Sequence, residues 1–360
     1  MKIRTILIII QRSNGDVLLS ASLINQLNDN FRPNGIDLLV NIDTLPIAQT
    51  LPNVRQIHTF SYKEKHENKL NQERKIIKKI FRKYDLSINL TSSDRSVIYA
   101  LLASKKSISA VEHDYFKAWW KKILLKYHFT YDLNSHILIN NLKPLSLLGL
   151  NASNHQASPK HSQAAFSSIQ DKLRKLKITK FIIFHPSAQY NYKVYDKKLR
   201  HSLLHLLNTL NISIIISGGK SEIDIKIKAS LPKLTNIYDF IGDTTIDEYI
   251  VLSSLSEGYI GMDTLNMHIA ASHNKRIFAI FGPTNVNMWS PWSNTLQGSA
   301  VKSKPLQTYD NITIFQADMP CVACGEKGCR NNGEVSECLS NISPNLIFKE
   351  IEEWLSSNSL

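Results

Sequence analysis

The sequence predicts an α/β protein made of two Rossmann-like, doubly wound parallel-sheet domains. Short apolar runs alternate with helix-like segments, and a polar stretch without periodicity interrupts this alternation near the middle of the chain. Strands that alternate with helices are typical of parallel sheets, and 360 residues exceed what one hydrophobic core usually serves. We therefore expect one domain over residues 1–165 and a second over 166–360, facing each other across a cleft that holds the ligands.

In the first half, four apolar runs predict strands, and two segments with helical spacing predict helices. The strands are expected at 6–10, 36–40, 54–60 and 86–90, and the helices at 17–27 and 69–83. The second helix is strongly basic. The polar segment from 150 to 168, which has no hydrophobic periodicity, predicts the linker between the domains.

In the second half, each predicted strand ends in polar, turn-forming residues. The strands are expected at 181–184, 212–216, 259–260 and 276–281, with helices at 199–210, 267–272 and 346–355. The tips are 185–187, 217–219, 261–264 and 282–284. Because the carboxyl ends of parallel strands meet at one edge of a sheet, these tips are expected to line one ligand site.

The turn at 261–264 and the helix after it have the pattern of a phosphate-binding site, because the first N–H groups of a helix are unpaired. Asp263 or Thr264 would cap this helix. Lys193 could reach a phosphate as a point charge, and Glu222 could accept hydrogen bonds from ribose hydroxyls. The alternative is an ordinary βαβ unit with a capped helix and solvated loop side chains.

Gly15-Asp16 follows the first strand directly and precedes a helix. A lone carboxylate at this edge could take a proton from a hydroxyl group. It could also be the N-cap of a helix that begins at Val17, a position that Asp occupies well. From the residues alone, the cap is the favoured interpretation.

The chain is basic, with 43 Lys and Arg against 30 Asp and Glu and a net charge of +13. A field of this sign attracts nucleic acid, an anionic membrane or a phosphorylated substrate. Alternatively, the excess lysines are only solvated residues on exposed helix faces. The first apolar run is too short for a signal peptide, and no window reaches the length of a membrane span. A cytoplasmic protein is expected.

All four cysteines lie in one C-terminal block with the spacing C-x2-C-x4-C-x8-C. In a reducing compartment, such a block favours a metal over disulfides. Because the later spacings are tighter than common zinc patterns, free structural thiols are the favoured interpretation, and a structural zinc or iron site is the alternative. The residues concerned are Cys321, Cys324, Cys329 and Cys338.

The chain resembles glycosyltransferase family 9, the ADP-heptose:lipopolysaccharide heptosyltransferases. The resemblance rests on ILIIIQRSNGD at 6–16, HPSAQYNYKVY at 185–195, SGGKSEID at 217–224, and GMDTLNMHIAAS at 261–272 followed by FGPT. It implies a GT-B fold and an inverting transfer of heptose from a nucleotide diphosphate sugar, ADP-heptose, to the inner core of lipopolysaccharide. No metal or other cofactor is required for this chemistry.

The resemblance also implies roles for individual residues. The catalytic base falls on Asp16. The donor-binding positions fall on Ser187, Lys193, Glu222, Thr244, Asp263, Thr264 and His268.

The implied acceptor carries carboxylates and phosphates and is presented at the inner membrane, where the enzyme would be peripheral. Arg55, Lys63, Lys65 and the basic helix at 74–83 are expected to face it. The segment FKAWWKKILLKYHF at 116–129 mixes aromatic, aliphatic and basic residues as an interfacial helix would. Alternatively, it is a helix that packs on its domain while its lysines extend into water.

Two departures from the family pattern bear on the donor. Leu265 stands where members usually carry a glycine that lets the backbone approach the pyrophosphate. Ala188 replaces a residue that is usually small and polar in the family, and the spacing from there to Lys193 is one residue longer than is usual in the family. A different nucleotide sugar, used by a hexosyltransferase or an epimerase, is therefore an alternative. Nucleic acid is not an expected partner, since the chain lacks any recognition signature for it.

Overall fold

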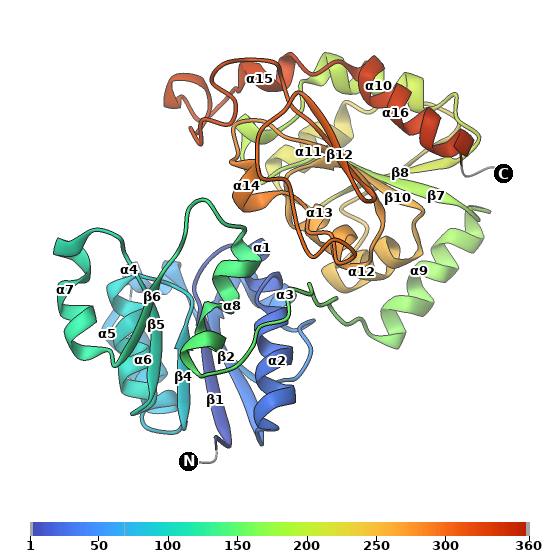
Figure 1. The fold of residues 1–360 in the computed structure, drawn as a ribbon. Coiled ribbons are helices and arrows are strands. Elements are labelled where there is room, and N and C mark those ends of the chain that lie inside the picture. Colours follow the sequence, from blue (N-terminus) through green and yellow to red (C-terminus); the bar gives the residue numbers. More distant parts are fainter. Residues whose placement is uncertain (1–2, 68, 358–360) are drawn as a thin grey trace. The chain divides into compact units, whose positions relative to one another are not determined.

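The structure, a computed structural model, describes residues 3–67 and 69–357 (Figure 1). The chain forms two compact units, Met1–Lys160 and His161–Leu360, whereas the predicted boundary after residue 165 falls in the first turn of helix α9 (Gln163–Lys175). The predicted linker at 150–168 is therefore too long, because Ser162 already caps α9 by accepting a hydrogen bond from the N–H of Ala165 at 3.1 Å.

The N-terminal unit contains a six-stranded parallel sheet with the strand order β3-β2-β1-β4-β5-β6. Its strands are β1 (Thr5–Ile10), β2 (Gly35–Asn41), β3 (Val54–Phe60), β4 (Leu86–Asn89), β5 (Ser107–Val111) and β6 (Tyr127–Thr130). The first four confirm the predicted strands. Figure 1 shows α5 and α6 on one side of the sheet and α2 on the other, so the strands are buried on both faces, as their continuous apolar runs predict.

The helices of this unit differ from the prediction in two places. They are α1 (Asn14–Leu18), α2 (Ala21–Phe31), α3 (Leu45–Ala48), α4 (Tyr62–Glu67), α5 (Lys69–Ile80), α6 (Asp94–Ala103), α7 (Tyr115–Leu124) and α8 (Ile137–Leu147). The single helix predicted at 17–27 is two helices, because Ser20 Oγ donates to the carbonyl of Val17 and ends α1. The segment at 116–129 is a helix followed by a strand.

The C-terminal unit contains a seven-stranded sheet with the order β12-β13-β11-β10-β7-β8-β9. Its strands are β7 (Phe181–His185), β8 (Ser213–Gly218), β9 (Ile237–Ile241), β10 (Gly258–Met262), β11 (Arg276–Ile280), β12 (Leu306–Tyr309) and β13 (Ile312–Phe315). All neighbours are parallel except the edge strand β12, which is antiparallel to β13. The sheet-based fold class is thus confirmed in both units.

Helices surround this second sheet. They are α9, α10 (Lys197–Leu207), α11 (Glu222–Ala229), α12 (Ile246–Leu255), α13 (Leu265–Ser272), α14 (Val286–Trp289), α15 (Glu337–Ser340) and α16 (Pro344–Ser357). The core on one face joins β7, β8 and β10 to α10 and α16 through buried Ile, Leu and Phe side chains. No helix in the described part of the chain is long and apolar enough to cross a membrane.

Each sheet has a point where the order of strands reverses, and parallel sheets bind ligands at such points. In the N-terminal unit it lies between β1 and β4. In the C-terminal unit it lies between β7 and β10. Asp16 follows β1, and Asp263 follows β10, so the sheet topology brings both to a switch point of their own unit.

Candidate active site

Asp16 is part of the tight turn that leads from β1 into α1. Its side chain is only 7% exposed, and its Oδ2 accepts hydrogen bonds from the N–H and the hydroxyl of Ser13 at 3.2 and 2.6 Å. Ser13 is the N-cap of α1, and Asp16 is the third helical residue of a capping box. The interpretation of Asp16 as the N-cap of a helix starting at Val17 is therefore wrong, because the helix begins three residues earlier, at Asn14.

Two residues that the sequence did not single out surround Asp16. Arg12 Nε lies 3.0 Å from Asp16 Oδ1, and its guanidinium lies 5.0 Å from the ring centre of Tyr131. Burial alone would lower the pKa of Arg12, but Asp16 and Tyr131 raise it. Burial raises the pKa of Tyr131 to about 12, so its hydroxyl stays protonated and donates to the carbonyl of Leu90 at 2.6 Å. Arg12 thus holds the carboxylate oxygen that Ser13 does not contact.

Several buried polar side-chain atoms in this unit have no hydrogen-bond partner among the described residues. Gln11 is 5% exposed, and neither its amide nitrogen nor its oxygen has a hydrogen-bond partner among the described residues. The same holds for Asn41 Oδ1 and Asn141 Nδ2. Asn41 donates to the carbonyl of Arg12 at 3.3 Å, and Asn141 lies beside the hydroxyl of Tyr131. Buried amides are usually paired, so these atoms are suited to binding a polyhydroxylated ligand.

In the C-terminal unit, Lys193 and Asp263 form an ion pair between two strand tips. Lys193 Nζ lies 3.1 Å from Asp263 Oδ2, and the two side chains are 27% and 10% exposed. Burial alone would lower the pKa of Lys193, but the charge of Asp263 and the hydrogen bond to it raise it. Lys193 is therefore charged at neutral pH and can bind an anionic group beside β7 and β10.

Helix α13 begins directly after this ion pair. Gly261 and Met262 belong to β10, so the predicted four-residue turn contains only Asp263 and Thr264. Thr264 is the N-cap residue, but its side chain forms no capping hydrogen bond and instead lies 3.5 Å from the hydroxyl of Tyr259. Leu265 is the first helical residue and is partly exposed. The N–H groups of this first turn can still donate hydrogen bonds to an anion.

His268 and His185 are both buried near this turn. His268 is on α13 and is 2% exposed. His185 ends β7, and its Nδ1 lies 3.0 Å from Ser217 Oγ and from Asn266 Nδ2. Burial lowers the pKa of His185 to about 4, which makes it a neutral imidazole that ties β7, β8 and α13 together.

Ser187 follows β7 and is 3% exposed. It hydrogen-bonds Asp224, a residue that the sequence analysis did not single out. Burial alone would raise the pKa of Asp224, but hydrogen bonds from Ser187, Ser221 and the N–H of Gly219 lower it. Asp224 thus fixes the turn between β8 and α11 beside the loop that follows β7.

The other two predicted donor residues lie in more open positions. Glu222 is the first residue of α11, its side chain is 82% exposed, and it pairs with Lys226 at 2.6 Å. Thr244 is partly exposed in the loop between β9 and α12. Their donor roles stay predictions.

The predicted acceptor residues do not form one cluster in the described part of the chain. Arg55, on β3, makes a bidentate pair with Asp37 at 2.9 and 2.8 Å. Asp37 also accepts a hydrogen bond from Tyr84 at 2.7 Å, so Arg55 has a structural partner. Lys63 is exposed on α4. The side chain of Lys65 lies outside the described residues.

The cysteine block is a loop around a short 3-10 helix, Cys329–Asn331. Cys321 and Cys324 are exposed, Cys329 is half-buried, and Cys338 is buried on α15. Within residues 3–67 and 69–357, no three His, Cys, Asp or Glu side chains are arranged to hold a metal ion. A zinc or iron ion at these thiols stays a prediction.

Comparisons with known proteins identify the family. Residues 73–319, more than half of the chain, match glycosyltransferase family 9 (heptosyltransferase). The chain is 25% identical to lipopolysaccharide heptosyltransferase 3 of Escherichia coli over 295 residues, which cover 79% of this chain and 85% of that protein.

Solved structures with the same fold support this assignment. A family 9 glycosyltransferase from Veillonella parvula superposes with a TM-score of 0.78 at 16% identity, covering 99% of both chains. The E. coli ADP-heptose lipopolysaccharide heptosyltransferase II superposes with a TM-score of 0.73 at 17% identity, covering 99% of this chain and 100% of that one. These likenesses show the predicted GT-B fold. Together with the sequence match, they show that the chain is a glycosyltransferase and belongs to glycosyltransferase family 9, the heptosyltransferases.

Proposed function

We propose that this enzyme transfers a heptose from ADP-heptose to the inner core of lipopolysaccharide. The observation that carries the proposal is the similarity to E. coli lipopolysaccharide heptosyltransferase 3 across four fifths of the chain. The ion pair of Lys193 and Asp263 at a strand switch point adds a cation where a diphosphate would bind. Peripheral association with the inner membrane is part of this proposal, because a lipid-anchored acceptor is presented there.

In the proposed reaction, Asp16 takes the proton of an acceptor hydroxyl as the hydroxyl oxygen attacks the anomeric carbon of the heptose. The bond from that carbon to the β-phosphate oxygen breaks, and ADP leaves with the electron pair. Attack opposite the leaving group inverts the anomeric configuration, so one base is sufficient. Ser13 and Arg12 keep the carboxylate of Asp16 oriented.

The leaving diphosphate gains negative charge in the transition state. Lys193 and the first N–H groups of α13 would stabilise this charge. Leu265 places a side chain beside these N–H groups and reduces the room for a pyrophosphate. For this reason the nucleotide is the part of the proposal that most needs an experiment.

The test is a panel of ADP, UDP, GDP and their sugar conjugates, measured by thermal unfolding of the purified protein. ADP-heptose at about one hundred times its Kd should stabilise the protein by about 2.7 kcal/mol. For a unit of this size, that corresponds to an increase in Tm of about 5–10 °C. The protein should also release ADP from ADP-heptose when an inner-core acceptor that lacks the heptose is present. Stabilisation by UDP or GDP sugars, with none by ADP or ADP-heptose, would contradict the proposal.

A further inference from the structure

Helix α7 exposes its apolar side chains and buries a charged one. Tyr115, Phe116, Trp119, Ile123 and Leu124 are 68%, 85%, 50%, 73% and 59% exposed. The helix residues that face the unit's core are Ala118 and Lys121, both fully buried, and the partly buried Trp120. A surface helix normally has the opposite arrangement, with its apolar stripe on the core and its charges in water. Two features of α7 therefore need an explanation: what holds the helix in this orientation, and what its exposed apolar side chains bind.

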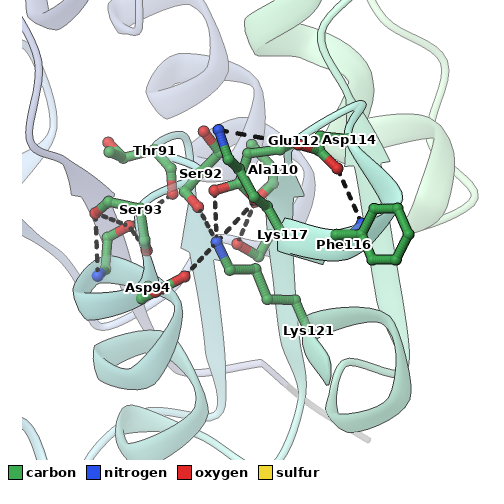
Figure 2. A network of polar contacts seen from close by, with 12 residues as sticks. Thr91, Ser92, Ser93, Asp94, Ala110, Glu112, Asp114, Phe116, Lys117 and Lys121 are labelled. Atoms are coloured by element: carbon green, nitrogen blue, oxygen red, sulfur yellow. Dashed lines mark hydrogen bonds and ion pairs between the residues drawn. The ribbon is translucent and has the colours of Figure 1, made fainter. Parts of the chain in front are cut away.

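The cause is a network around the ammonium group of Lys121, shown in Figure 2. Lys121 Nζ lies 2.7 Å from Asp94, 2.6 and 2.8 Å from the two carboxylate oxygens of Glu112, and 2.6 Å from the carbonyl of Ser92. A buried ammonium must keep such partners, because losing them leaves an uncompensated charge. Turning α7 to bury Phe116 would break all of these contacts. In Figure 2 the ring of Phe116 points away from the network.

The outward face of α7 is continuous. Residues 115, 119 and 123 are spaced four apart and share one side of the helix, and Phe116 lies beside them. Lys117 and Lys122 border this face, one on each side, and Lys126 follows the end of the helix. The side chain of Lys117 is 72% exposed. The outward surface therefore has an apolar centre and a basic margin.

We propose that this α7 face docks the N-terminal unit on the surface of an anionic lipid bilayer. Aromatic side chains are favoured at the boundary between headgroups and acyl chains. Flanking lysines pair with lipid phosphates, which matches the net charge of +13. A second copy of the chain fits less well, since a symmetric contact would place lysines against lysines. The inference extends the proposed function to the surface that meets a lipid-borne acceptor, but lipid binding needs neither donor nor acceptor.

Co-sedimentation with vesicles tests the inference. The full-length protein is mixed with vesicles of phosphatidylcholine, or of phosphatidylcholine with one third phosphatidylglycerol, without any lipopolysaccharide. We expect binding to the anionic vesicles. In the variant Phe116→Ser/Ile123→Ser, the partition coefficient should fall by at least about tenfold, because two exposed apolar side chains no longer enter the bilayer.

Two further variants make the test specific. Val301→Ser removes an apolar side chain that is 70% exposed in the C-terminal unit and should leave lipid binding unchanged. Lys117→Gln/Lys122→Gln/Lys126→Gln should remove the preference for anionic over neutral vesicles. The exchanged positions are exposed except Lys122, which is partly buried, so the Tm of each variant should stay close to that of the wild type.

Three outcomes would overturn the inference. The first is equal vesicle binding by the wild type and Phe116→Ser/Ile123→Ser. The second is a lipid-free dimer, seen by sedimentation velocity, that this variant converts to monomers. The third is the absence of lipid binding by the wild type. Sugar transfer to a water-soluble core oligosaccharide is measured in parallel, and it would fail only if the proposed function itself were wrong.

Discussion

Replacing Asp16 with asparagine separates the two roles that this carboxylate can have, a helix cap and a proton acceptor. Asparagine keeps an oxygen that can accept the hydrogen bonds from Ser13, which now lie at 3.2 and 2.6 Å. It loses the charge that faces Arg12 and cannot take a proton. The substitution should therefore leave the turn largely intact and remove the proposed base.

The structure sets the expected sizes of both effects. Loss of a complete cap costs about 0.5–2 kcal/mol of unfolding free energy. Removing one partner of a largely buried ion pair costs up to about 3–5 kcal/mol, and the side chains of Asp16 and Arg12 are only 7% and 27% exposed. Because asparagine keeps part of the cap and Arg12 keeps some contact with water, we expect Asp16→Asn to cost about 2–4 kcal/mol, which lowers Tm by about 4–16 °C. Removal of a general base should lower kcat by about 10²–10⁴-fold.

The assay is the release of ADP from ADP-heptose at saturating donor and acceptor, with Tm measured on the same preparations. Ser13→Ala is the matched control, because it removes the capping hydroxyl but keeps the carboxylate of Asp16. Its stability should fall by about 1 kcal/mol, and its kcat should stay within about tenfold of the wild type. The reasoning is refuted if folded Asp16→Asn keeps more than a tenth of its turnover, or if Ser13→Ala loses as much as Asp16→Asn.

Three further predictions follow from the C-terminal unit. Lys193→Met should weaken ADP binding, measured by calorimetry, by about 10–100-fold, because it removes the cation between two strand tips. The control is Lys349→Met, which replaces an exposed lysine on α16 and should leave the Kd for ADP unchanged. If the Kd of Lys193→Met stays within threefold of the wild type, the proposed donor role of Lys193 is contradicted. Gly261→Ala should lower the unfolding free energy by about 1–3 kcal/mol in urea, since a Cβ there would clash with a carbonyl oxygen of β7 and lie 2.9 Å from Tyr259 Oη. Gly298→Ala is the control and should cost less, because a Cβ there would lie 3.6 Å from the carbonyl oxygen of Leu296, an ordinary van der Waals contact. When the protein is treated at pH 8 with a disulfide reagent that labels free thiols, the exposed Cys321 and Cys324 should react first and Cys338 last. Burial raises the pKa of Cys338 to about 11, so its side chain remains an unreactive thiol below that pH. If all four thiols are equally unreactive until a chelator is added, a bound metal is indicated instead.

The strands were the most predictable part of the fold. The run Ile6–Ile10 is apolar throughout and β-branched at every position except Leu7, and a strand buried on both faces requires such an apolar run. The segment 116–129 was harder, because no glycine or proline divides it and its apolar and basic residues suit one long helix. Its second part becomes β6 through pairing with β5, where Ile108 is the partner of Tyr127. That partner lies outside the segment, so local pattern could not reveal it.

The site was predictable where it depends on strand ends and hidden where it depends on distant partners. Asp263 and Lys193 follow strands whose ends meet, so parallel-sheet topology alone places them close together. The partners of Asp16 are partly local, as with Ser13, but Tyr131 comes from the far edge of the sheet. The buried position of Lys121 depends on carboxylates at positions 94 and 112, and a lysine among aromatic residues otherwise indicates a solvated face.

The position of the switch points has a consequence for folding. The pairing of β1 with β4 joins Ile6 to Leu86, and the pairing of β7 with β10 joins Ile182 to Gly258. These are contacts between residues far apart in sequence, which form late because a long loop must first close. The candidate site residues of each unit are therefore brought into place only after strands about 80 residues apart in sequence have paired. Amide protons at these strand ends should exchange only by global opening of the unit, and a truncated unit should lose its ligand together with its cooperative unfolding transition.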